Sequence, residues 1–254
     1  MNKKMYLIIF ISLITTTLIS QSNPFILVKY NYSNLKLKEF SEVELRAKGT
    51  VSLTVFKRKD TTKSSVYIDD MGIGRFHNFS DDAIGKKVYK NLISEILIFR
   101  DMAIKEGRLT PFVVSEKLPV FNWVFMNKKK KIGNFSCKYA KVEFRGRTYF
   151  VWYTLEVPLI HGPWKFHGLP GLMVEVVSKD LNINFQLQSI KKIDSHVLII
   201  NKPSMGEKIT FKKYVEYKNK AVDEFIKRMY TKLPRGAKIE INSVVDHNLE
   251  KTFN

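Results

Sequence analysis

Residues 133–177 read GNFSCKYAKVEFRGRTYFVWYTLEVPLIHGPWKFHGLPGLMVEVV, and this stretch decides how the chain folds. Residues 136–144 and 147–157 are rich in aromatic and β-branched side chains, which favour strands. The pair Arg145-Gly146 between them is compatible with a tight turn. We therefore predict two adjacent antiparallel strands.

Both faces of the second predicted strand carry aromatic rings. Alternate side chains of a strand point to opposite sides. One face therefore carries Tyr149, Val151, Tyr153, Leu155 and Val157, and the other carries Thr148, Phe150, Trp152, Thr154 and Glu156. Either both faces are covered by other elements, which is the commoner arrangement, or one face lines a groove for an apolar partner.

Residues 158–172 connect this strand to the next one and contain a turn motif, made of Gly162, Pro163, Gly168, Leu169, Pro170, Gly171 and Leu172. The last four residues of the motif predict a type II turn in which Gly171 takes a positive φ. Trp164 and Phe166 are large apolar groups that we expect to fold back onto the sheet. The motif is predicted to be structural, a rigid plug or corner covering one end of the sheet, with a ligand-contacting loop as the alternative.

Four motifs follow one another here: Gly-x-x-x-Cys-x-x-Ala at 133–140, Phe-x-Gly-Arg at 144–147, Val-Trp-Tyr-Thr at 151–154 and Gly-Pro-Trp-Lys-Phe-x-Gly-Leu-Pro-Gly-Leu at 162–172. In this order they closely resemble the GLPGLI family of Bacteroidetes secreted proteins. Met173 stands where the family motif ends in Ile, an apolar residue of similar volume. The resemblance implies export and an architecture, and it carries over no reaction or ligand.

The N-terminus has the parts of a secretory signal peptide. Lys3 and Lys4 precede the mostly apolar run 6–20, and the small residue Ser20 precedes Gln21. We predict a signal peptide over residues 1–20 and a single domain over residues 21–254, destined for the periplasm, the cell envelope or the exterior. A membrane anchor is the alternative, but the run is shorter than the roughly 20 apolar residues of a spanning helix. The mature chain is expected to be soluble.

Cys137 is the single cysteine, so no intramolecular disulfide can form and stability must come from packing. The residue lies in a predicted strand, where a lone cysteine is usually a small buried apolar group. A catalytic or redox thiol would need access and a lowered pKa.

The chain is strongly basic, with a formal net charge of +19. Such a surface attracts anionic surfaces. An exported protein would meet these in the form of lipid headgroups, lipopolysaccharide and acidic glycans. Most of the lysines are scattered, which is typical of residues that keep a protein soluble. Nucleic acid is not an expected partner, because no recognised binding motif accompanies the charge. The densest run, Lys128–Lys131, is predicted to be a solvated turn.

The remaining patterns predict a mainly β protein of the α+β class. It should contain a curved antiparallel sheet or meander of roughly 7–10 strands, with at least two packed helices. Further strands are predicted at 51–56, 65–68, 120–126, 172–177, 181–188, 197–200 and 238–245. One helix is predicted from a cap at 80–82 to Gly107, because Ile84, Val88, Leu92, Ile93, Ile96 and Leu97 recur at helical spacing. A second helix is predicted over 210–232.

Few residues suggest chemistry. His161 and His167 flank the Trp164 segment and, with Met173 or Glu175, are weak candidates for a metal site, although their spacing is not a recognised ligand pattern. No cofactor and no catalytic residue is predicted, and a hydrolase would need a clustered nucleophile, base and oxyanion donors.

The favoured function is a non-enzymatic carrier or accessory protein that binds an apolar or peptide-like ligand. The candidate ligand-binding residues are Trp152, Tyr153, Trp164, Phe166 and His167. A metal-binding accessory protein using His161 and His167 is one alternative, and an interaction module for an outer-membrane partner is another.

Overall fold

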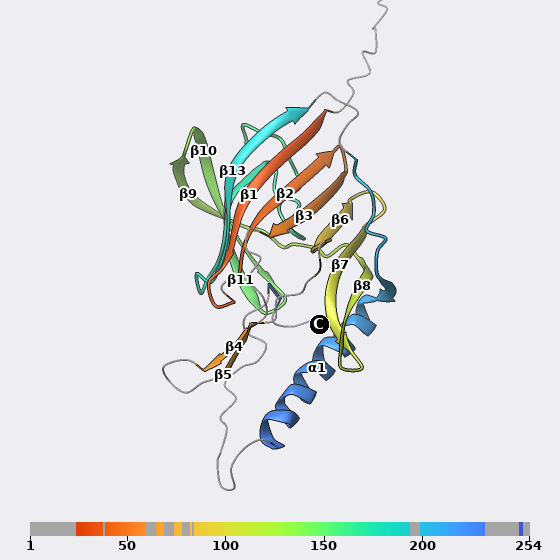
Figure 1. Cartoon of the computed structure of the whole chain (residues 1–254). Helices are drawn as coiled ribbons and strands as arrows, with labels where there is room; N and C mark the ends of the chain where they lie inside the picture. Colours follow the sequence, from red (N-terminus) through yellow and green to blue (C-terminus); the bar gives the residue numbers. More distant parts are fainter. Residues whose placement is uncertain are drawn as a thin grey trace, which may run out of the picture.

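One large sheet of 12 strands organises the chain (Figure 1). Its strand order is β14-β8-β7-β6-β3-β2-β1-β13-β12-β11-β10-β9. The neighbouring strands run antiparallel, except that β14 lies parallel to β8. A separate two-stranded sheet contains β4 and β5.

The computed structural model describes residues 24–37, 39–58, 65–68, 74–77, 82, 84–193, 199–231 and 249–250. Within them the elements are β1 (Phe25–Asn34), β2 (Glu39–Lys48), β3 (Val51–Arg58), β4 (Ser65–Ile68), β5 (Gly74–His77), β6 (Lys87–Asn91), β7 (Ile96–Lys105), β8 (Arg108–Lys117), β9 (Val124–Ile132), β10 (Phe135–Phe144), β11 (Arg147–Thr154), β12 (Leu172–Ser178), β13 (Ile183–Ile193), β14 (Glu207–Thr210) and α1 (Phe211–Thr231). The predicted signal peptide (1–20) and the predicted last strand (238–245) lie outside the described residues.

Strands β1 and β13 join two meanders. On one side of β1 the sheet continues through β2, β3, β6, β7 and β8, and beyond β13 it continues through β12, β11, β10 and β9. The pairing is long, with Phe25 opposite Ile193 and Asn34 opposite Ile183. The prediction of a mainly β protein is confirmed, and the described strands outnumber the roughly 7–10 that the sequence suggested.

The sheet curls from the β9–β10 hairpin round to β7 and β8 (Figure 1). Twisted open sheets rarely exceed about 10 strands without curling. The pairing register also shifts between Lys29 and Tyr30, between Lys138 and Tyr139, and between Trp152 and Tyr153, and such irregularities bend strands. The inner face carries the apolar core, whose fully buried members include Val28, Tyr30, Leu45, Tyr149, Val151, Val176 and Phe185.

Helix α1 packs on β7 and β8 through aromatic pairs. Tyr214 contacts Phe99 edge to face at 5.2 Å between ring centroids, and Tyr217 stacks on Phe112 at 5.3 Å. The Thr210 hydroxyl accepts a hydrogen bond from the backbone N–H of Lys213 and so caps the helix start. No helix in the described part of the chain combines the length and the apolar character that a bilayer crossing requires.

The helix predicted from 80–82 to Gly107 is wrong. Strands β6 and β7 occupy this stretch, joined by a turn in which the Asn91 side chain accepts hydrogen bonds from the backbone N–H groups of Ile93 and Ser94. Ile93, one of the residues at helical spacing, lies at the tip of this turn with 79% of its surface exposed. The described residues therefore contain one α-helix, α1, which the prediction over 210–232 located correctly.

Two other predictions need correction. The lysine run 128–131 belongs to β9, and the turn follows it at Gly133. The strand predicted at 120–126 accordingly begins later, at Val124, because residues 118–123 form an irregular connection that contains Pro119. For the strand predicted at 197–200, residues 197–198 lie outside the described residues, and 199–200 have no strand structure.

The type II turn predicted at 169–172 is also wrong. Gly171 is not among the glycines with positive φ, whereas Gly168, at φ 89°, is. Glycine is needed at position 171 because a Cβ there would overlap the backbone carbonyl of Thr154. The constraint is therefore a close approach between two backbone segments, and no side-chain rotation can relieve it.

We predict that Gly171→Val lowers the free energy of unfolding by about 3 kcal/mol, because the added side chain must push two backbone segments apart. Gly107→Ala is the control, since a Cβ at Gly107 has no neighbour within 4 Å and meets only the cost of a positive φ of 76°. That cost is about 1 kcal/mol. Urea unfolding of both variants tests this, and equal losses would contradict the close-approach explanation.

Candidate functional site

The motif segment, residues 158–172, lies inside the curled sheet. Side chains from two separate parts of the chain hold it there. From β6, the Lys90 Nζ donates hydrogen bonds to the carbonyl oxygens of Gly162 at 2.8 Å and Phe166 at 2.6 Å. From the β8–β9 connection, Trp123 Nε1 donates to the carbonyl oxygen of His167 at 3.0 Å. The segment therefore ties together strands that are far apart in the sheet order.

The apolar side chains of the motif segment fill the interior. Trp164 and Phe166 are buried, as predicted, with 3% and 0% of their surfaces exposed. The Phe166 ring lies 4.9 Å from that of Tyr149 and 5.5 Å from that of Phe121, in inclined arrangements favoured by aromatic pairs. The space inside the sheet is occupied by the chain itself.

Lys90 is a fully buried lysine whose described hydrogen-bond partners are these two carbonyl groups. Burial holds its pKa well below the ordinary value, because removal from water disfavours the charged amine. The amine satisfies the buried carbonyl of Gly162, which would be costly to leave unpaired, and adds a second donor to the Phe166 carbonyl, which also accepts from the Gly162 N–H. Its role is to position the motif segment.

His161 and His167 lie opposite each other in an isolated antiparallel bridge, yet their rings are used separately. The Nε2 of His161 lies 3.1 Å from the Gly49 carbonyl oxygen, and the Nε2 of His167 lies 2.9 Å from that of Pro119. A carbonyl only accepts, so each Nε2 carries the proton and donates it. Among the described residues, no group of three His, Cys, Asp or Glu side chains is placed to hold a metal ion.

Burial and, to a smaller extent, the nearby Lys90 amine lower the pKa of both histidines, to about 3 for His161 and about 4 for His167. Both rings are therefore neutral near pH 7, when each donates to its carbonyl.

A ring of buried ion pairs surrounds Lys165, in the middle of the motif segment. Lys165 Nζ contacts Glu116 Oε1 at 2.5 Å and Glu250 Oε1 at 2.9 Å. Arg145 contacts the same two carboxylates, each at 2.6 Å. The pKa of Arg145 is raised: burial alone would lower it, but the two carboxylates outweigh that effect. The four charged side chains balance one another, as buried charges must.

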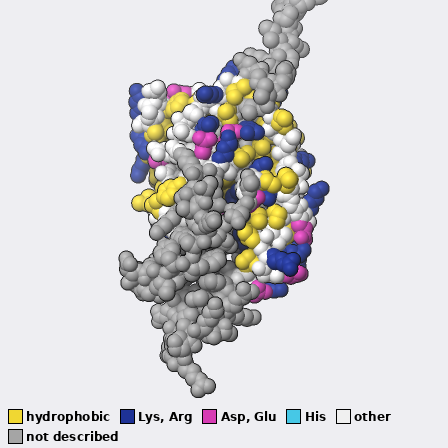
Figure 2. Space-filling view, in the orientation of Figure 1, with side chains coloured by type: hydrophobic (Ala, Val, Ile, Leu, Met, Phe, Trp, Pro, Cys, Tyr) yellow, Lys and Arg dark blue, Asp and Glu magenta, His cyan; other side chains and the backbone are white. Residues whose placement is uncertain are grey.

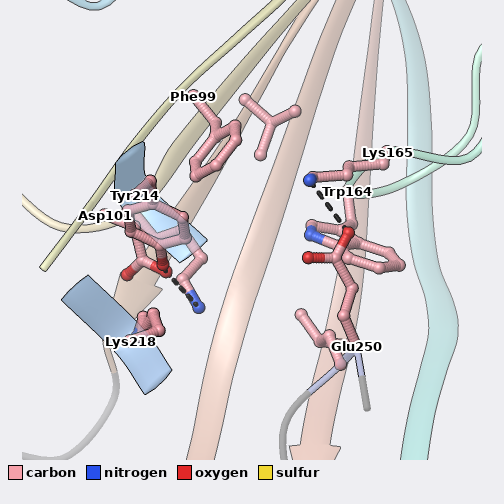
Figure 3. A pocket seen from close by; sticks show the side chains of 10 residues that line it. Phe99, Asp101, Trp164, Lys165, Tyr214, Lys218 and Glu250 are labelled. Atoms are coloured by element: carbon pink, nitrogen blue, oxygen red, sulfur yellow. Dashed lines mark hydrogen bonds and ion pairs between the residues drawn. The ribbon is translucent and has the colours of Figure 1, made fainter. Parts of the chain in front are cut away.

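A small cavity adjoins this ring (Figure 3). Lys165 and Glu250 lie on one side of it, and Asp101 and Tyr214 lie on the other, where the Tyr214 hydroxyl donates to Asp101 Oδ2 at 2.7 Å. Burial would raise the pKa of Asp101, but Lys86, at 3.6 Å, and other neighbours hold it below its ordinary value. The cavity holds about 50 Å³, enough for a few water molecules.

The outer face of the sheet carries a second cluster, which we call the outer aromatic row: Tyr139, Phe150 and Trp152. These rings are half-buried, and the Tyr139 ring lies 5.7 Å from that of Phe150 and 4.3 Å from that of Trp152. Two lysines of β9 approach the row from the side. Lys128 Nζ lies 5.6 Å from the Tyr139 ring centroid and Lys130 Nζ lies 4.5 Å from that of Trp152.

The structure separates the five predicted ligand-binding residues. Tyr153, Trp164 and Phe166 belong to the core, and Tyr153 has only 4% of its surface exposed. His167 is half-buried beside Phe121, its ring 5.0 Å away. Trp152 alone of the five belongs to the outer aromatic row, and the role of all five in ligand binding remains a prediction.

Sequence analysis missed the partners of these residues. Lys90 lies in the stretch predicted to be a helix, Glu116 lies between the predicted helix and the strand predicted at 120–126, and Lys165 lies within the predicted turn motif region. Lys165 lies between two aromatic residues that are expected to be buried. A buried lysine needs an oppositely charged partner, so this position could have indicated an ion pair.

Fold and site together define a curled, open β-sheet protein whose interior is filled by its own connecting segment. A family described as "Protein of unknown function (Porph_ging)" matches residues 142–175, which hold the end of β10, β11, the motif segment and the start of β12. No curated protein matches the chain.

Solved structures with a similar fold include two crystal forms of PNGF-II. The P21 form aligns with a TM-score of 0.51 and 14% identity, covering 78% of this chain and 34% of PNGF-II. The C2 form aligns with a TM-score of 0.49 and 15% identity, covering 78% and 33%. The chain thus spans about a third of the length of PNGF-II, and the likeness concerns the fold alone.

We predict that His161 makes stability fall as the pH drops from 7 to about 5. The unfolded ring binds a proton near pH 6.5, whereas the folded ring remains neutral until about pH 3. The unfolded state therefore takes up more protons over this range, and stability is lost as the pH falls. His161→Gln, whose amide can still donate to Gly49, should remove about 2 kcal/mol of this loss.

Urea unfolding at pH 7 and at pH 5 measures the effect. His167→Gln should act in the same direction, because the folded-state pKa of His167 is also lowered, to about 4. A loss between the two pH values that is the same in His161→Gln as in the parent protein would contradict the assignment.

Proposed function

We propose that the protein is an exported, non-catalytic binding protein of the cell envelope that holds an apolar or peptide-like ligand on the outer aromatic row. One observation carries the proposal: Tyr139, Phe150 and Trp152 form a contiguous, half-exposed set of rings on the face of the sheet opposite to the core. Aromatic groups in such a position give binding area at little cost in conformational entropy.

The cavity found among the described interior residues is much smaller than a usual ligand pocket. Ligand pockets for small molecules usually measure about 300–1,000 Å³. The cavity beside Lys165 measures about 50 Å³, and the rings of Trp164 and Phe166 occupy the space inside the curled sheet. A ligand held by the described part of the chain is therefore better accommodated on the outer face than inside the sheet.

Export is supported by the sequence. Residues 1–20 have the charged, apolar and small-residue parts of a signal peptide, and the motifs from 133 to 172 resemble the GLPGLI family of secreted proteins. The positive charge suits an anionic envelope surface. On the face shown in Figure 2, Lys and Arg side chains are scattered among apolar and neutral ones, so the charge supplies general attraction and the rings supply the contact.

The neighbouring polar groups suit a ligand with hydrogen-bonding groups as well as apolar ones. Glu175, opposite Trp152 in the sheet, pairs with Lys130 at 3.0 Å, and Gln186 lies opposite Glu175 in the next strand. Aromatic, charged and amide side chains thus follow one another across the strands. A peptide presents apolar and polar groups at a comparable spacing.

We predict that Trp152→Ala removes a ligand that co-purifies with the mature protein. The protein would be purified from the exported fraction of its own host and analysed by native mass spectrometry, followed by denaturation to identify what is released. Loss of a central aromatic contact should weaken binding by tenfold or more, on the order of a hot-spot residue.

Phe125→Ala is the matched control. Phe125, in the nearby strand β9, is also aromatic and is 60% exposed. It lies opposite Ala140 and contacts Tyr153, on the inner face. The proposal requires that the ligand persist in this variant and disappear in Trp152→Ala. Equal retention in both variants, or a parent protein that carries no ligand, would overturn it.

A further inference from the structure

Strand β9 forms one edge of the large sheet. β9 is the last strand in the sheet order and pairs only with β10 within the described part of the chain. Alternate N–H and C=O groups along its other side are thus available to an added strand. The opposite end of the sheet differs, because β14 has four residues and runs directly into α1.

This edge is long and open. β9 has nine residues, and all of them except Met126 and Ile132 are exposed. A strand of this length is as long as many peptide segments that bind by strand addition to a sheet edge.

The edge carries positive charge on both faces. Lys128 and Lys130 lie on the outer face, over the rings of Tyr139 and Trp152. Since side chains alternate along a strand, Lys129 and Lys131 lie on the other face, and both are exposed. Four consecutive lysines therefore border the unpaired backbone of the strand.

We infer that the β9 edge docks an extended acidic segment of a partner protein, which adds to the sheet as a further strand. Backbone hydrogen bonds would hold the segment, and its carboxylates would lie across from the lysines on both faces. Lys130 already pairs with a carboxylate across the outer face, that of Glu175 at 3.0 Å. Directly opposed residues of unlike charge stabilise strand pairs.

A second copy of the chain is the wrong occupant for this edge. Two β9 edges brought together would place one lysine run close to another, and each chain has a net charge of +19. Edge lysines are a known means of preventing such self-pairing. The same lysines leave the edge open to a strand of opposite charge, so they select the partner as well as exclude the copy.

The inference rests on the proposed function only in taking the ligand to be a peptide, and it concerns the edge of β9, while the proposed function concerns the outer aromatic row. The two can fail separately. Lys129 and Lys131 point away from the row, so their replacement leaves Tyr139, Phe150 and Trp152 and the two lysines above them unchanged.

The test uses a capped nine-residue peptide with four consecutive central Glu residues and Val or Thr elsewhere, titrated into the full mature chain by calorimetry. The double variant Lys129→Glu/Lys131→Glu should weaken binding at least tenfold. The matched control is Lys191→Glu/Lys192→Glu, which changes the net charge equally at two exposed lysines of β13, a strand four places away from β9 in the sheet order. Its affinity for the peptide should stay within about twofold of the parent value.

A second peptide separates strand pairing from charge attraction. N-methylation of alternate amides removes the donors needed for edge pairing and keeps every carboxylate. Weak binding of this peptide supports the inference. Trp152→Ala should bind the unmethylated peptide with the affinity of the parent protein, which also supports it. Equal binding of both peptides, equal loss in the two double variants, or dimerisation of the parent chain through β9 in sedimentation would each overturn it.

Discussion

A buried loop must have partners for its backbone polar groups, and the interior of this molecule is arranged to supply them. Some backbone groups of the motif segment pair with each other, as Gly162 N–H does with the Phe166 carbonyl and Gly168 N–H with the Ile160 carbonyl, and side chains of the surrounding elements donate to further carbonyls. Lys90 donates to Gly162 and Phe166, Trp123 to His167, and Thr54 to Trp164 at 3.5 Å. A buried lysine, unusual in a core, follows from this requirement.

The need to fill the sheet has the same origin. An open sheet of 12 strands curls, and a curled sheet leaves a space that must be packed with apolar atoms. Trp164 and Phe166 supply this volume from within the chain. Lys165, which lies between them, then has to be buried as well, and the carboxylates of Glu116 and Glu250 with Arg145 complete its charge balance. The buried charged side chains around Lys165 therefore stabilise the packed interior.

Local patterns predicted strands β10–β13, the burial of Trp164 and Phe166, and helix α1. They failed at β6 and β7, where Ile84, Val88 and Leu92 happen to recur every four residues although Val88 is buried in a strand. They failed at Lys128–Lys131, because a charged run is taken for a turn when nothing local shows that it lies on a sheet edge. The ion pairs of Lys165 join residues from four distant parts of the chain, and spacing carries no information about such contacts.

The pairing of β1 with β13 has a consequence for how the chain reaches this structure. These strands lie far apart in the chain, since Phe25 pairs with Ile193, and only β14 of the large sheet follows them in the sequence. The chain is synthesised from its N-terminus. Until residue 193 has been made, the β1–β3 meander has no β13 to pair with, and one of its apolar faces stays uncovered. The long loop closed by that contact makes for slow folding, and the time spent waiting is when such a chain is most exposed to aggregation and most dependent on a chaperone.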